Sequence, residues 1–182
     1  PTPSAPAIDP VTPVCENGTL VLNAALVAGA TYNWSGPSGF ISNTQSPAIP
    51  NITAAMAGTY AVNIIVNGCR SANNNVNVTV NPLPAAPSLG TGGAVCVGNT
   101  LLLNAATVAG ASYNWTGPNG FSSTLQNPTI PNAALSNAGI YTAFIRVNGC
   151  AGPSGTVTAT VNPLPGAVNI TSSGAVCEGR PL

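Results

Sequence analysis

Apolar residues occupy every second position in two early segments of the chain. Leu20, Leu22 and Ala24 do so in the first segment, and Tyr32 and Trp34 do so in the second. An alternation with a period of two residues is typical of a β-strand that buries one face. We therefore expect two short strands here, each with its apolar side chains turned toward a core.

A longer alternation predicts a hairpin further along. Asn67-Gly68 separates its two arms, and Asn-Gly between alternating apolar runs is a strong signal for a tight hairpin turn. The buried positions are expected at Tyr60, Val62, Ile64 and Val66 in the first arm and at Val76, Val78 and Val80 in the second.

Turn residues and prolines separate the remaining apolar positions. Gly36-Pro37-Ser38-Gly39 has the composition of a turn, and Phe40, Ile49 and Ile52 mark short strands after it. Short strands at this spacing, with no helical period, indicate an antiparallel β-sandwich of about seven strands. The fold class expected for the chain is all-β.

The whole pattern repeats with a period of 81 residues. We expect module 1 at residues 1–81, module 2 at residues 82–162 and the start of a truncated third module at residues 163–182. Asn81-Pro82-Leu83-Pro84 begins a proline-rich joint, which favours an extended and rather stiff spacer. The repeated landmarks are Cys15, Trp34, Tyr60 and Cys69 in module 1, then Cys96, Trp115, Tyr141 and Cys150, and finally Cys177.

The order of these motifs resembles the immunoglobulin pattern. It comprises a strand B, a core tryptophan on strand C, a strand E and a tyrosine corner. The resemblance implies tandem immunoglobulin-like sandwiches with Trp34, Trp115, Tyr60 and Tyr141 in their cores. Two features depart from that pattern. The cysteines of strands B and F are replaced by other residues, and the acidic residue expected two places before the corner glycine is Met56 in module 1 and Asn137 in module 2. The matching motifs are Leu20-x-Leu22-x-Ala24, Trp34, Ile49-x-x-Ile52 and Ala57-Gly58-x-Tyr60-x-Val62, then Leu101, Leu103, Ala105, Trp115, Ile130 and Ala138-Gly139-x-Tyr141-x-Ala143. The replacements are Ala24 and Val62 in module 1 and Ala105 and Ala143 in module 2.

Taken whole, each module is similar to the PKD-like and Ig-like modules of giant secreted adhesins of gliding and surface-attached bacteria. The similarity rests on a Val-Cys near the module start, a Tyr-Asn-Trp-x-Gly-Pro-x-Gly-Phe run, an Ala-Gly-x-Tyr corner and a Val-Asn-Gly-Cys before the last strand. It implies export by the type IX pathway. It also implies a place in a cell-surface filament, stalk or adhesin.

The composition excludes several classes of function. Charged residues make up only 3% of the chain, against about 25% in an average domain, and the formal net charge is zero. Nucleic acids and anionic membranes require clustered basic residues, so neither is expected as a partner. No apolar run reaches the roughly 20 residues of a spanning helix, so we expect no membrane insertion of this segment.

Catalysis and metal binding are also not expected. The chain has no His and no Lys, and its carboxylates are Asp9, Glu16 and Glu178, which cannot form an acid and base pair within one module. There is no Cys-x-x-Cys spacing to suggest a zinc site. We therefore expect no enzyme activity, no cofactor and no metal.

The cysteines are disulfide candidates, which suggests an oxidising, extracytoplasmic setting. They allow two pairings. Within a module, Cys15 would pair with Cys69 and Cys96 with Cys150. In the immunoglobulin order, however, strands B and F run in the same direction, so Cys15 and Cys69 would lie at opposite poles, roughly 25 Å apart. A disulfide needs Cα atoms within about 7 Å.

The second pairing joins neighbouring modules. A bond from Cys15 to Cys150 would link two modules across the proline joint, and Cys69 and Cys96 would then face modules outside this chain. Cys177 belongs to the third copy. The sequence leaves both pairings open.

Lateral association of chains is a further expectation. The alternation that buries Tyr60 turns Asn63 and Ile65 outward, and in module 2 it turns Phe144 and Arg146 outward. On a surface with so little charge, we expect Ile65, Phe144 and Arg146 to take part in contacts between chains that self-associate into a multi-chain filament. The edge segment at residues 73–77 has no charged side chain to oppose such association.

These observations favour a structural segment of a long extracellular filament or adhesin stalk, attached to the cell surface, with an unknown target at its distal tip. It would mediate surface attachment or cell-cell contact. One alternative is a carbohydrate- or protein-binding module, with its ligand on the Gly36–Phe40 turn or the Leu26–Ala30 loop. Another is a spacer in a large secreted enzyme.

Overall fold

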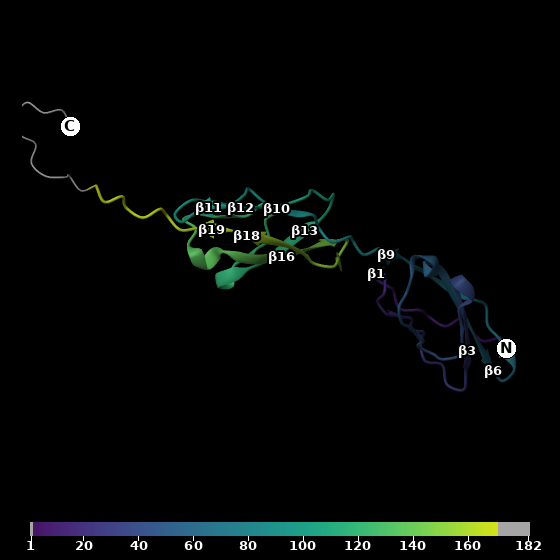
Figure 1. Ribbon diagram of the computed structural model, residues 1–182. Coiled ribbons are helices and arrows are strands. Elements are labelled where there is room, and N and C mark those ends of the chain that lie inside the picture. Colours follow the sequence, from purple (N-terminus) through teal and green to yellow (C-terminus); the bar gives the residue numbers. More distant parts are fainter. Residues whose placement is uncertain (1, 171–182) are drawn as a thin grey trace, which may run out of the picture.

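The computed structural model describes residues 2–170, and its regular elements are strands and short 3₁₀ turns. Figure 1 shows two β-sandwiches placed end to end and connected by an extended segment. In module 1 the strands are β1 (Val14–Cys15), β2 (Leu20–Val21), β3 (Thr31–Ser35), β4 (Ile41–Ser42), β5 (Ala48–Ile49), β6 (Gly58–Val66), β7 (Cys69–Arg70), β8 (Asn74–Val78) and β9 (Val80–Asn81), with 3₁₀ turns η1 (Pro37–Gly39) and η2 (Ala54–Met56).

Module 2 follows the same plan. Its strands are β10 (Leu89–Thr91), β11 (Val95–Cys96), β12 (Leu101–Ala105), β13 (Ser112–Thr116), β14 (Ser122–Ser123), β15 (Thr129–Ile130), β16 (Gly139–Val147), β17 (Cys150–Ala151), β18 (Gly155–Ala159) and β19 (Val161–Asn162), with 3₁₀ turns η3 (Pro118–Gly120) and η4 (Leu135–Asn137).

Each module is a sandwich with the immunoglobulin strand order. One sheet of module 1 has the order β4-β3-β6-β7, and β8 also pairs with β6. Facing it are β2 and β5, and an antiparallel bridge from Ile8 to Ala24 adds the first strand. Module 2 repeats both sheets as β14-β13-β16-β17, with β18 on β16, and β10-β12-β15. The predicted all-β tandem sandwich fold is confirmed.

The first strand of each module changes sheets partway along. Residues near Ile8 pair with strand B, and β1 then pairs in parallel with β9. Pro10 and Pro13 lie between the two pairings, and proline has no N–H to donate to a ladder, so continued pairing with strand B is interrupted there. Module 2 makes the same change from β10 to β11, which pairs in parallel with β19. The switch carries each module's first cysteine to the pole where the last strand ends (strand G; β9 in module 1 and β19 in module 2). We call this end of a module its exit pole and the opposite end its entry pole.

The two modules have separate hydrophobic cores. Alternating side chains of strands B, C and F fill each of them, and full burial of one such side chain contributes roughly 1.5–3 kcal/mol. Ala24, Val62, Ala105 and Ala143 fill the positions of the missing core cysteines, and all four are buried. The largest fully buried side chains in the two cores include Leu20, Leu22, Ile52, Tyr60 and Ile64, and Leu101, Leu103, Trp115, Tyr141 and Ile145.

A tyrosine corner fixes the Gly-Pro-x-Gly-Phe turn, which has the same conformation in both modules. The Tyr60 hydroxyl donates to the backbone carbonyl of Met56 at 2.9 Å, and Phe40 packs edge-on against the Tyr60 ring. Gly36 lies on that ring so closely that an added Cβ would be 2.4 Å from it. The turn is therefore part of the core packing.

One expected surface residue is buried. Asn63 was expected to face solvent but is only 5% exposed. Its side chain lies on the outer face of β6, where Arg70 Nε donates to Asn63 Oδ1 at 2.9 Å and Asn63 Nδ2 donates to Asn73 Oδ1 at 3.1 Å. The chain that follows the hairpin folds over this residue, which the strand alternation alone does not reveal.

Candidate functional site

The joint between the two modules contains a disulfide. Cys15 Sγ of module 1 is bonded to Cys150 Sγ of module 2, with an S–S distance of 2.03 Å and a Cα–Cα distance of 5.5 Å. The bonded residues are 135 positions apart in the sequence. Of the two pairings that the sequence left open, the structure contains the one that links the modules.

Two neighbouring segments bring these cysteines together. Cys15 is the last residue of β1, and its position beside Asn81 at the end of β9 places it at the exit pole of module 1. Cys150 opens β17 directly after the turn Asn148-Gly149, whose φ angles of 50° and 82° suit the tight hairpin that the sequence predicts. At the same joint, Asn81 Nδ2 donates to the Asn148 carbonyl at 3.4 Å.

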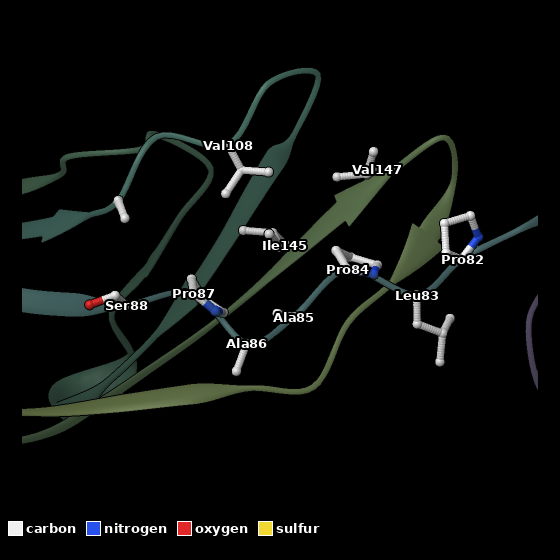
Figure 2. A pocket seen from close by; sticks show the side chains of 11 residues that line it. Pro82, Leu83, Pro84, Ala85, Ala86, Pro87, Ser88, Val108, Ile145 and Val147 are labelled. Carbon is white, nitrogen blue, oxygen red and sulfur yellow. The ribbon is translucent and has the colours of Figure 1, made fainter.

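The proline segment packs along module 2. Figure 2 shows residues 82–88 beside Ile145 and Val147 of β16, with Val108 across from them. Together they line an apolar groove of about 420 Å³. Within the spacer Pro87 is buried and Pro84 is half-buried, so the spacer is seated on the module surface at these two residues, in addition to the stiffness of its prolines.

Two glycines allow the spacer to come this close. A Cβ on Gly152 would lie 2.4 Å from the Pro84 carbonyl oxygen, and one on Gly155 would lie 2.6 Å from that of Pro87. Module 1 has Ser71 and Asn74 at the corresponding positions. This difference between the repeats is a signal in the sequence for the contact, although sequence reasoning did not identify it.

The loop between strands B and C also faces the joint in module 2. The Tyr113 hydroxyl accepts from the Val108 N–H at 3.1 Å and donates to the Ala106 carbonyl at 2.9 Å, which fixes the loop. Both loop residues line the groove under the spacer. Tyr32 holds the equivalent Leu26–Ala30 loop of module 1 in the same way. Of the module 2 equivalent of the loop considered as a ligand site, Val108 lines this groove, while Thr107, Ala109 and Gly110 are exposed.

The other cysteines have different surroundings. Cys69 is exposed and Cys96 is partly buried, and both are free thiols. By contrast, Cys150 in the joint is only 1% exposed. Cys177 lies outside the described residues.

The aromatic residues expected in the cores lie there. Trp34 is 2% exposed and Trp115 is 1% exposed, so neither ring is presented to a sugar. Tyr60 and Tyr141 are fully buried, and desolvation raises the pKa of both phenols above its usual value. Tyr141 donates to the Asn137 carbonyl at 2.8 Å, as Tyr60 does to Met56.

The residues proposed for lateral contact are less exposed than a simple alternation suggests. Ile65 and Phe144 are partly buried, while Arg146 is exposed and stacks its guanidinium over the Phe144 ring, 5.5 Å from the centroid. Ile140, on the outer face of β16 in module 2, is 62% exposed, and Ile41 of β4 in module 1 is 81% exposed. Sequence reasoning missed these two, because it considered only the far end of strand F and not its first residues or the neighbouring strand β4.

The described residues provide little reactive chemistry. Within 2–170, no group of three or more His, Cys, Asp or Glu side chains is placed to hold a metal ion. The same part of the chain contains no helix with the length and apolarity needed to cross a bilayer.

Solved structures similar to this chain share its fold. One chain of the crystal structure of the mouse coronavirus receptor-binding domain complexed with its murine receptor is 17% identical, with a TM-score of 0.51, covering 86% of this chain and 99% of that one. The extracellular domains 3–5 of Drosophila OTK are 13% identical, with a TM-score of 0.50, covering 87% of this chain and 60% of that one. At these identities the likeness concerns the fold alone. No curated protein sequence matches the chain.

A domain family gives the more specific match. The family described as "Ig-like domain CHU_C associated" matches residues 3–82 and again residues 84–163, and no catalytic family is indicated. An Ig-like fold with a disulfide indicates an extracellular or secreted protein, because disulfides persist in oxidising environments. Two tandem copies cover most of the chain, which therefore belongs to the CHU_C-associated Ig-like domain family.

Proposed function

We propose that this chain is a structural repeat segment of a long extracellular filament or adhesin stalk, which mediates attachment to a surface or contact between cells. The observation that carries the proposal is the joint, where a disulfide and an apolar spacer contact fix one module on the next. Modules that are fixed to one another in this way serve spacing better than ligand capture. The target would then be bound at a distal tip, with the parent protein attached to the cell surface.

Two features argue against a ligand site at the positions first considered. The Gly36–Phe40 turn packs on Tyr60, and Val108, in the module 2 equivalent of the Leu26–Ala30 loop, lines the groove beside the spacer. The resemblance to modules of giant adhesins supports export by the type IX pathway as part of the same proposal. A spacer role in a secreted enzyme would instead require a catalytic domain in the parent open reading frame.

Imaging of intact cells tests the proposed function. Antibodies raised against the 182-residue chain, carrying gold particles, should label projections that extend away from cells producing the parent protein. The purified chain should in addition bind no glycan or matrix protein in an array. Gold confined to the cell interior, or specific binding that is lost when residues of the Gly36–Phe40 turn are changed, would contradict a stalk.

Lateral association of such stalks is the second part of the proposal. Phe144 and Ile140 lie on the outer face of β16, which carries Arg146 as its only charged side chain. With free thiols alkylated, sedimentation velocity should show association that grows with concentration and weakens in Phe144→Ser and Ile140→Ser variants. Leu164→Ser, at an exposed residue after module 2, is the matched control. Equal association in all variants would remove this face from the proposal.

A further inference from the structure

The two outer poles of the described chain carry the same groups that meet at the joint. At the joint, Cys15 and Asn81 of module 1 face Cys150 and the Asn148 carbonyl of module 2. One period away, Cys96 and Asn162 lie at the exit pole of module 2, and Cys69 and Asn67 lie at the opposite pole of module 1. Each group of the joint therefore has an unpaired counterpart on one of the outer poles.

We propose that these outer poles are complementary docking surfaces for other copies of the same module pair, closed by a disulfide between Cys96 of one copy and Cys69 of the next. This inference rests on the proposed stalk function and specifies its partner, which is a second copy of this chain. The contact is directional, because an exit pole meets only an entry pole.

The exit pole has the same form whether or not it is bonded. Cys15 pairs in register with Asn81 on the parallel strands β1 and β9, and Cys96 pairs with Asn162 on β11 and β19 in the same way. Cys15 and Cys96 are both partly buried. The free thiol is thus already held in the position that its bonded counterpart occupies, so little ordering is needed for docking.

The entry pole is also preformed. Asn67 and Gly68 have φ angles of 49° and 78°, against 50° and 82° for the corresponding turn at the joint. The main difference is exposure, because Cys69 is exposed whereas Cys150 is 1% exposed. Docking of a neighbouring module accounts for this difference, since it covers the hairpin that carries the thiol.

The spacer side of the entry pole differs between the modules. Ser71 replaces Gly152, and Asn74 Nδ2 donates to the Pro6 carbonyl at 2.9 Å where Gly155 admits Pro87. These residues lie along the spacer, on the arm that follows the cysteine. Pro6 and Pro87 are one period apart, so the spacer before module 1 meets the same strand position through a side-chain hydrogen bond, and the cysteine and the hairpin turn keep the geometry of the joint.

The bond forms by thiol–disulfide exchange with a small disulfide such as oxidised glutathione. The thiolate of Cys69 attacks one sulfur, forming a mixed disulfide and releasing one glutathione thiolate. The Cys96 thiolate of the other copy then attacks the protein sulfur of the mixed disulfide and releases the second glutathione. Two protein thiols are oxidised, and one glutathione disulfide is reduced to two thiols.

Two matched variants of the full chain test the direction of docking. Copy A carries Cys69→Ser and Cys177→Ser and keeps Cys96, whereas copy B carries Cys96→Ser and Cys177→Ser and keeps Cys69. Copy B also carries a size tag. Both keep the Cys15–Cys150 bond, which is checked by non-reducing peptide mapping before the copies are mixed in equal amounts in a glutathione redox buffer.

The proposal predicts that the mixed A–B dimer exceeds either homodimer roughly tenfold, against twofold for random pairing, which corresponds to a preference of about 1 kcal/mol. Peptide mapping of that dimer should recover Cys69 joined to Cys96. Dimers in the proportions of random pairing, or no dimers, would overturn the proposal. So would chains in which Cys15 and Cys150 are unbonded, because the internal template would then be lost. None of these results depends on surface display, so they leave the imaging test of the stalk independent.

Discussion

Pulling on the two ends of this chain should extend it much less while the Cys15–Cys150 bond is intact than after reduction. The bond encloses the whole chain between the two cysteines, which includes strands B to F of both cores. Tension applied at the ends passes from the first residues to Cys15, across the bond to Cys150 and out through the last strands of module 2, β18 and β19. The enclosed chain is not part of that path.

The magnitude follows from the sequence separation of 135 residues. A fully extended chain spans at most about 3.3–3.6 Å per residue, so the bond withholds roughly 450–490 Å of contour length. After reduction, unfolding of both modules should release this length, less the short native distance between the two cysteines.

Single-molecule force spectroscopy measures this length directly. Handles are ligated to terminal peptide tags, so that no further cysteine is introduced, and each molecule is pulled with and without a reducing agent. Cys15→Ser should behave like the reduced chain. Cys69→Ser leaves the bond in place and should behave like the oxidised chain. Full-length unfolding of the oxidised chain would refute the reasoning, because it would show that tension reaches the enclosed strands.

The same reasoning extends to the proposed docking of copies. If every joint carries the bond, tension runs through segments such as the one from Cys69 to Cys96, which already consists of strands and the proline spacer. An array of stapled modules would therefore resist extension through covalent bonds as well as through its cores.

Three further predictions concern the modules themselves. Gly117→Ala should destabilise module 2 by about 1–3 kcal/mol in denaturant unfolding, because a Cβ there would lie 2.3 Å from the Tyr141 ring. The control Gly166→Ala, whose Cβ would have nothing within 4 Å, should have no effect. Equal effects of the two substitutions would contradict the packing of Gly117 on the ring. The free energy of unfolding should fall as pH rises above about 10. Burial raises the pKa of Tyr60 and Tyr141 in the folded protein, so the unfolded chain loses these protons first and binds fewer of them at high pH. A Tyr60→Phe, Tyr141→Phe variant that kept the full slope of stability against pH would exclude this cause. Leu103→Ala should lower the free energy of unfolding of module 2 by about 2–5 kcal/mol, because Leu103 is buried in its core. Calorimetry of the reduced chain should show two unfolding transitions, of which only one shifts. A shift of both transitions would mean that the two cores are not separate.

Much of the fold was predictable from the residues alone. The alternation at Leu20, Leu22 and Ala24, and that from Tyr60 to Ile64, identified buried faces of strands, and the matching side chains are buried in both modules. Asn67-Gly68 marked a hairpin that the structure contains. These inferences succeeded because side-chain periodicity and turn chemistry are local properties, which a few neighbouring residues express.

Other features depended on contacts between distant segments. Asn63 satisfies the outward alternation of β6, but its burial follows from Arg70 and Asn73 folding over it. Gly152 has no special role in its own strand and matters because Pro84 of the spacer lies against it. Neither contact is visible in the pattern of one strand.

The sequence by itself determined the tandem repeat, the all-β fold, the aromatic cores and the scarcity of charge, because each follows from residue identity and spacing. Only the tertiary structure decided the partner of Cys15. A disulfide requires its two Cα atoms to lie within about 7 Å, and which cysteine meets that condition depends on how the first strand changes sheets and how one module sits on the next. That arrangement turns a repeated cysteine pattern into a bond between modules.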